Sequence, residues 1–185
     1  MARISLSALA LVMCASVALG ADNRATEEDA AVIRAALAEE CAWAGSGYHV
    51  MSTAPLPIHA GDQVPADWAD AGQLSARLIE RSTPPGNWSG YRICDKMLLR
   101  DERDIRRAMA SSSDPGRRWK NLRRVWPGAL GLKTASLPAY SEDGRRAVVV
   151  VNDDCGFLCG SMDIFELEKV AGAWRRVRDR NLEME

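Results

Sequence analysis

The fold of this chain is decided by the apolar run Ala147-Val148-Val149-Val150-Val151. Four consecutive valines leave no polar face, a pattern typical of a central strand that is covered on both sides. Further strands are predicted over 131–137, 161–170 and 173–177, with a turn over 141–144. Because these strands follow one another at hairpin spacing, the last third of the chain predicts an antiparallel β-meander.

Helices are predicted ahead of this meander. The segment Thr26-Glu27-Glu28-Asp29 offers an N-cap and places acids at the positive end of a helix, and the apolar spacing that follows puts Cys41 on its inner face. Other helices are expected over 65–82, 101–110 and 115–126, and short strands over 48–53 and 91–99. This order predicts an α+β fold with N-terminal helices packed on a C-terminal antiparallel β-meander.

An export signal is predicted at the start of the chain. Arg3 supplies a positive charge, residues 6–19 are almost wholly apolar, and Ala18-Leu19-Gly20 fits a small-x-small cleavage site. The apolar stretch is too short for a good transmembrane helix. A lipoprotein alternative would need Cys14 as the modified residue, and the methionine before it is too large for that processing site. We therefore expect residues 1–20 to be a signal peptide.

Residues 21–185 are expected to form a single α+β domain, long enough to bury its own core. The whole chain has 24 basic and 25 acidic residues, a formal net charge of −1, which gives no general case for binding nucleic acid or membranes. We expect a periplasmic or secreted protein with no stable membrane span in the mature chain.

The cysteine count fits export. Cleavage would remove Cys14 and leave four cysteines, and an even number in an oxidising compartment favours disulfides. Four cysteines allow three pairings, of which we favour Cys155–Cys159 as a local bridge and Cys41–Cys94 as a long-range one. Chain entropy predicts about 2 kcal/mol of stabilisation from the short loop and nearer 4 kcal/mol from the long one.

The segment between two predicted strands, Cys155-Gly156-Phe157-Leu158-Cys159-Gly160, is expected to be a hairpin tip closed by a disulfide. A thiol-disulfide enzyme needs a thiol of lowered pKa, whereas Asp153 and Asp154 would raise the pKa of the neighbouring Cys155 thiol. A structural bridge is therefore favoured over a redox site. Phe157 and Leu158, two apolar residues held at the tip, form the candidate binding surface.

The sequence contains no CxxC, HExxH or GxSxG motif, so it predicts no catalytic residue, no metal site and no cofactor. We interpret His49 and His59 as solvated or hydrogen-bonded side chains rather than ligands. Glu166 and Glu168 fall on one strand face, as paired carboxylates of a glycosidase can. The interpretation that we favour is the solvated face of an amphipathic strand.

A basic segment between Arg100 and Arg124 is interleaved with Trp119 and Trp126. In an exported protein its partner would be an anionic envelope component or an acidic protein, not nucleic acid. The interpretation that we favour is the outer face of one helix. We expect its charge to be neutralised by acids of the first helix, namely Glu27, Glu28, Asp29, Glu39 and Glu40.

Several of these features recur together elsewhere. The Ser141–Gly144 turn, the double-cysteine tip at Cys155–Gly160 and the strand Gly172-Ala173-Trp174 resemble a group of uncharacterised exported bacterial proteins. That group pairs a C-G-x-L-C-G tip with a following G-x-W strand. The strand after the tip begins here with Ser161-Met162-Asp163, where small or aromatic residues are more usual. The resemblance implies the architecture and the export, and it implies no activity.

The expected function is a non-catalytic binding or envelope-accessory module, with the hairpin tip as its contact surface. The alternative is an enzyme, either a thiol-disulfide oxidoreductase that uses Cys155 and Cys159 or a hydrolase without a recognisable motif.

Overall fold

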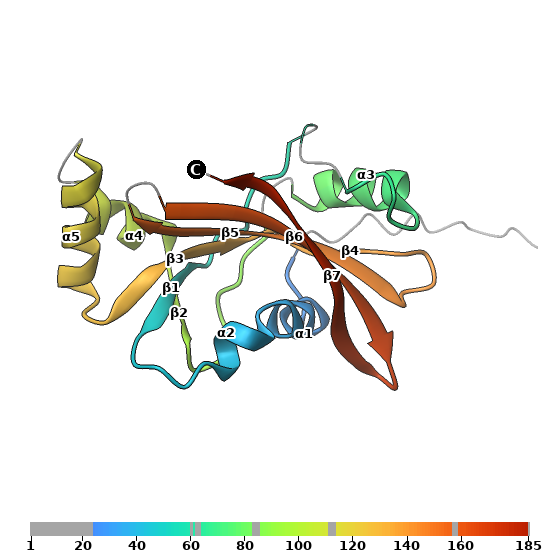
Figure 1. The fold of residues 1–185 in the computed structure, drawn as a ribbon, viewed down its shortest axis with the longest axis horizontal. Coiled ribbons are helices and arrows are strands. Elements are labelled where there is room, and N and C mark those ends of the chain that lie inside the picture. The colour runs from blue at the N-terminus through green and yellow to red at the C-terminus, as the bar shows by residue number, and fades with distance from the viewer. Residues whose placement is uncertain are drawn as a thin grey trace, which may run out of the picture.

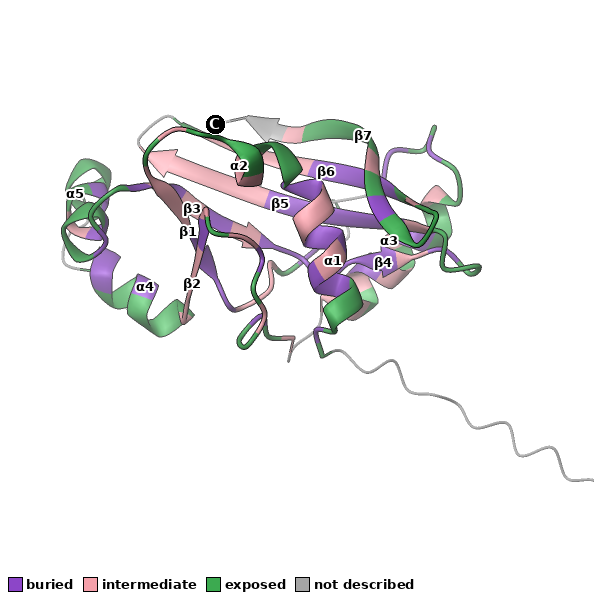
Figure 2. Ribbon diagram, turned by 90° about the horizontal axis from the view of Figure 1, so that it is seen from below, coloured by how far each residue is buried: buried purple, intermediate pink, exposed green. Residues whose placement is uncertain are grey.

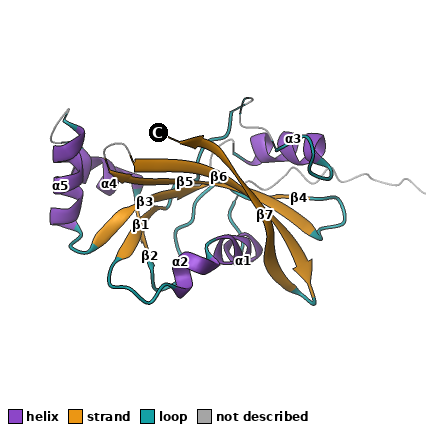
Figure 3. Cartoon of the chain, viewed as in Figure 1, coloured by secondary structure: helices purple, strands orange, loops and turns teal. Residues whose placement is uncertain are grey.

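A single β-sheet organises the part of the chain that the computed structural model describes, residues 24–59, 61, 64–82, 86–110, 114–156 and 159–184 (Figures 1 and 3). The predicted signal peptide lies outside these residues. The helices are α1 (Glu27–Ala36), α2 (Ala38–Ala42), α3 (Ala71–Arg81), α4 (Glu102–Met109) and α5 (Pro115–Val125). The strands are β1 (Tyr48–Ser52), β2 (Met97–Arg100), β3 (Ala129–Ala135), β4 (Ala139–Tyr140), β5 (Arg146–Gly156), β6 (Cys159–Val170) and β7 (Ala173–Met184). Among the described helices, none is long and apolar enough to cross a membrane.

The predicted α+β fold and its meander are confirmed. The strands lie in the order β2-β1-β3-β5-β6-β7, and β4 also pairs with β5. The pairs β3–β5, β5–β6 and β6–β7 are all antiparallel. The sheet extends beyond the meander, however, because β1 runs parallel to β3 and β2 runs parallel to β1. The result is a mixed sheet in which the N-terminal strands widen the C-terminal meander.

The strand predicted over 91–99 is wrong in its first half, because β2 begins only at Met97. The residues before it are held outside the sheet. The Tyr91 hydroxyl donates to the Ala25 carbonyl at 2.6 Å, and the Met97 amide closes a turn onto the Cys94 carbonyl at 3.1 Å. These contacts place Cys94 beside α2 instead of within a strand.

The valine run is covered on both faces, as predicted. Val149 and Val151 belong to the apolar cluster between the sheet and α1, whereas Val148 and Val150 belong to the cluster between the sheet and α3. All four are at most 3% exposed. In Figure 1 α1 lies below the sheet and α3 above it, and Figure 2 shows α1 crossing the lower face.

Helix α3 begins later than the predicted start at residue 65. Pro65 and Trp68 form a turn, in which the Trp68 amide donates to the Pro65 carbonyl at 2.9 Å. Asp70 then adopts a left-handed conformation with φ of 57°, which interrupts a helix, so the regular helix starts at Ala71. Trp68 of this turn and Leu74 of the helix are both buried against the sheet.

Helices α4 and α5 match their predicted ranges and pack together at the β1–β3 end of the sheet (Figure 1). Their N-caps are Asp101 and Asp114, whose side chains accept backbone amides of the first turn. The pair covers Val50 of β1. In the sheet, Val50 lies opposite Leu132 of β3, and Leu132 lies opposite Asp154 of β5. Asp154 is on the same face of β5 as Val150, because side chains of a strand alternate. Helices α3, α4 and α5 therefore share one face of the sheet.

A buried ion pair joins α1 to α3 at the end of the sheet. Both terminal nitrogens of the Arg81 guanidinium donate to the Asp29 carboxylate, at 2.9 and 3.0 Å, and the Tyr140 hydroxyl donates to it at 2.7 Å. Asp29 also caps α1, because it accepts the Thr26 amide at 2.8 Å while its own amide donates to the Thr26 hydroxyl. The Asp29 side chain is fully buried.

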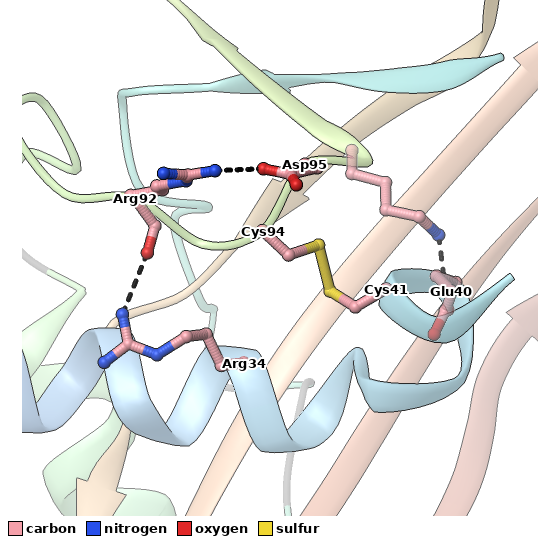
Figure 4. Close-up of a disulfide and its surroundings, with 7 residues drawn as sticks. Arg34, Glu40, Cys41, Arg92, Cys94 and Asp95 are labelled. Carbon is pink, nitrogen blue, oxygen red and sulfur yellow. Dashed lines mark hydrogen bonds and ion pairs between the residues drawn. A yellow bond between two sulfur atoms is a disulfide. The ribbon is translucent and has the colours of Figure 1, made fainter.

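Both favoured disulfides are present. Cys41 at the end of α2 is bonded to Cys94, with Cα atoms 5.9 Å apart (Figure 4). Beside this bridge Arg34 of α1 donates to the Arg92 carbonyl at 2.8 Å, so the same two segments are joined twice. Cys155 and Cys159 are bonded across the end of the β5–β6 hairpin, with Cα atoms 5.3 Å apart.

Candidate functional site: a groove on the sheet

The hairpin tip is closed by its disulfide, but its predicted contact residues, Phe157 and Leu158, lie outside the described residues. The pairing at the tip is irregular, because Gly156 and not Cys155 stands opposite Cys159. Helix α5 supports this end of the hairpin, where Arg123 donates to the Cys155 carbonyl at 3.3 Å. The end of β5 is thus held to α5.

The carboxylate of Asp153 belongs to a largely buried polar cluster. Its partner is Lys133 of β3, 2.8 Å away and only 3% exposed, which also lies 3.6 Å from Glu40 of α2. His49 of β1 completes the cluster, with Nδ1 3.7 Å from Asp153 Oδ1. His49 is mostly buried, whereas His59 is exposed in its loop. Within the described ranges, no group of three or more His, Cys, Asp or Glu residues could hold a metal ion.

The buried cluster should make stability depend on pH through His49. Burial lowers the pKa of His49, and the Lys133 ammonium lowers it further, while Asp153 and Glu40 act in the opposite direction. The unfolded chain therefore binds this proton first, at the ordinary value near 6.5. The contribution of neutral His49 to stability is present above that pH and is lost as the pH falls below it. Urea denaturation of His49→Gln between about pH 7 and pH 5 should show a shallower loss than the wild type.

The comparison variant is His59→Gln, which alters the other histidine of the chain, an exposed loop residue outside the cluster. Acidic groups elsewhere titrate equally in all three proteins, so the comparison isolates His49. Identical slopes for His49→Gln and the wild type would contradict the assignment.

The interpretation of Glu166 and Glu168 as one solvated face is wrong for Glu166. Its carboxylate is only 1% exposed and lies 2.9 Å from Arg178 of β7, whereas Glu168 is exposed. Arg178 in turn lies over the Trp68 ring, 5.9 Å from its centre. Both carboxylates therefore stand on β6 in different environments, and the buried one is an ion pair between neighbouring strands.

The expected neutralisation of the basic segment by the first helix is also wrong. Acids of α1 and α2 pair elsewhere, for example Glu28 with Lys169 and Glu39 with Arg176. The arginines of α4 and α5 pair instead with acids of their own helices and caps. These local pairs are Arg103–Asp101, Arg106–Glu102, Arg107–Asp104 and Arg117–Asp114. Three of these pairs join residues three or four apart, which face each other on a helix, and the fourth joins Arg103 to the N-cap Asp101.

A cavity opens where α4 and α5 leave part of the sheet uncovered. Its volume is about 450 Å³. Its apolar wall consists of Ile105, Met109, Ala110 and Leu132. Ile105 and Met109 are buried residues of α4 that pack with residues of α5, while Leu132 of β3 is partly exposed. The wall therefore combines one side of α4 with the floor of the sheet.

A second cavity of about 440 Å³ continues from the first toward α3. The two share Ser52, Glu102 and Thr134, so they meet over the ends of β1 and β3. One wall of the second cavity is the loop after β1, with Ala54, Pro55, Leu56 and Pro57, and the other is formed by Arg81 and Ser82 at the end of α3 and by Gly86. We call the two cavities together the sheet groove.

Polar groups line the floor and the rim of the sheet groove, and Arg81 and Ser82 add a third group at its α3 end. Ser52 on the floor is buried, and its Oγ accepts the Ala54 amide at 3.1 Å. At the rim, Glu102 and Arg106 form an ion pair at 3.2 Å, and Arg118 of α5 stands beside them as a second guanidinium. A mostly apolar cavity with a small number of oriented polar groups is the usual form of a ligand site.

Sequence reasoning did not identify the sheet groove. A strand over 131–137 and a helix over 101–110 were predicted, but neither prediction indicated that the two border the same cavity. Which stretch of sheet remains uncovered depends on the distance between α3 and α4, and no local pattern encodes that distance. The basic segment was the available signal, since it supplies the rim residues Arg106 and Arg118.

Comparison with known protein families, with curated proteins and with solved structures finds no match to this chain.

Proposed function

We propose that this chain is an exported, non-catalytic binding module whose ligand site is the sheet groove. The observation that carries the proposal is the pair of joined cavities of about 450 and 440 Å³ on one face of the sheet. Sites for small ligands have volumes of about 300–1,000 Å³, with mainly apolar walls and a few polar groups that orient the ligand. The sheet groove has this size and this composition.

The rigidity of its walls supports a binding role. The floor belongs to the central sheet, and α4 is held on it by the buried Ile105 and Met109. The opposite wall begins at Ala54, one residue after Thr53, whose backbone is tied to β2 and to Trp88 by hydrogen bonds of 2.9 and 2.7 Å. A cavity whose walls are fixed before binding loses little conformational entropy when it takes a ligand.

Export is part of the proposal. The two disulfides support it, because such bridges persist in oxidising compartments. The predicted signal peptide and the resemblance to exported proteins with a C-G-x-L-C-G tip agree with a periplasmic or secreted location. An anionic component of the cell envelope or an envelope protein would be a partner that fits such a location.

Filling the first cavity should weaken binding of an uncharged apolar probe. N-phenyl-1-naphthylamine is expected to bind the wild type with an increase in fluorescence. Ala110→Trp places an indole at the cavity from an exposed position at the end of α4 and should weaken the affinity at least about tenfold. Titration of the probe into each protein measures the effect.

The matched control is Ala69→Trp, an equally exposed alanine that does not line either cavity and should bind the probe as the wild type does. A double variant, Phe157→Ser with Leu158→Ser, separates the groove from the hairpin tip. Loss of probe binding in this double variant, with retention in Ala110→Trp, would place the site at the tip and overturn the proposal.

A further inference from the structure

The rim of the sheet groove carries an excess of positive charge on one side. Glu102 and Arg106 pair with each other across one turn of α4, so their charges largely cancel. Arg118 approaches the same cavity from α5. Among the described residues no carboxylate forms an ion pair with Arg118, whereas its neighbour Arg117 is paired with the N-cap Asp114. Arg118 is therefore a guanidinium available at the mouth of an apolar cavity.

The apolar part of the groove leads away from this guanidinium. The first cavity offers Ile105, Met109 and Leu132 close to Arg118. The second cavity lies beyond Ser52 and Thr134, where the loop wall presents Pro55 and Leu56. Arg81 also lines the second cavity, but its charge is balanced by Asp29 at 2.9 Å. The groove therefore has its unbalanced positive charge, Arg118, at one end, and apolar side chains over β1 and β3 lead away from it.

We infer that the ligand of the sheet groove is a single-chain amphiphile with a carboxylate head group. The inference rests on the proposed function and adds the chemistry of the ligand. The carboxylate is bound by Arg118, with Arg106 beside it, and the hydrocarbon chain lies over Leu132 toward Leu56. Charge complementarity selects this occupant, since a guanidinium fork binds a carboxylate through two parallel hydrogen bonds.

Two dependences follow from this arrangement. Affinity rises with chain length, by about tenfold for each two buried methylenes, because the chain leaves water for an apolar wall. Affinity also depends on the head group, because an uncharged hydroxyl forms no charge-assisted pair with Arg118. Octanoate, decanoate and dodecanoate should therefore bind with increasing affinity below their micellar concentrations, and decanoate should bind more tightly than 1-decanol.

The experiment is displacement of N-phenyl-1-naphthylamine from the full mature chain by each of these compounds. Arg118→Gln is expected to weaken decanoate about tenfold and to leave 1-decanol unchanged, because the variant removes only the charge-assisted pair. Lys120→Gln is the matched control. It removes one positive charge from the same helix at an exposed position that does not line the groove, and decanoate affinity should be retained.

Equal affinities of decanoate and 1-decanol in the wild type would overturn the inference of a carboxylate head group. Binding of the probe would still support a ligand site in the groove. Equal losses in Arg118→Gln and Lys120→Gln would also overturn it, since the effect would then arise from net charge. Displacement of the probe by an apolar tetrapeptide but not by decanoate would overturn the amphiphile and indicate a peptide ligand. Failure of the probe itself to bind would instead overturn the proposed function.

Discussion

Replacing Asp29 with alanine is expected to lower the free energy of unfolding by about 3–5 kcal/mol, because it leaves a buried guanidinium without its counterion. The Arg81 side chain is only 14% exposed, and both of its terminal nitrogens bind the Asp29 carboxylate. The substitution also removes the capping interaction with Thr26 and the acceptor of the Tyr140 hydroxyl. Urea denaturation at neutral pH measures the loss.

Glu27→Ala is the control for this prediction. Glu27 is an acid in the same first turn of α1, but it is exposed and pairs with Arg34 at the surface. Its loss should cost less than about 1 kcal/mol, as is usual for exposed pairs. If Asp29→Ala were as mild as Glu27→Ala, the buried ion pair would not join α1 to α3 in solution.

The second large effect is expected from the long-range disulfide. The double variant Cys41→Ala with Cys94→Ala should lose about 4 kcal/mol, because the bridge closes a loop with a sequence separation of 53 residues and limits the unfolded chain. The bridge also holds the segment before β2 against α2. Urea denaturation of the double variant and the oxidised wild type gives the difference.

The other bridge provides the comparison. Cys155→Ala with Cys159→Ala opens a loop with a separation of only 4 residues and should cost about 2 kcal/mol. The expected order is therefore a larger loss at Cys41–Cys94. The reverse order would show that the hairpin tip contributes native-state contacts beyond chain entropy, in which case its role would be more than that of a local bridge.

The candidate site could be predicted from the sequence only in part. The rim arginines were visible as a basic segment, and helices α4 and α5 were predicted within a residue of their observed ends. Their partners were predicted wrongly, because α1 packs on the other face of the sheet and its acids pair with residues other than those of α4 and α5, as Glu28 does with Lys169. Composition reports how many charges a segment has, whereas pairing depends on the face on which the segment packs.

The chain's local patterns determined its central strand and its meander, and they favoured the two disulfides that are observed. Val148 to Val151 predicted burial on both faces because alternate side chains of a strand point to opposite sides. Only the tertiary structure decided that β1 and β2 extend the sheet in parallel and that Glu166 is buried against Arg178. It also decided that α3 and α4 leave a groove between them. These features join residues far apart in the chain, and the periodicity of a segment records which of its sides is apolar but not which element covers that side.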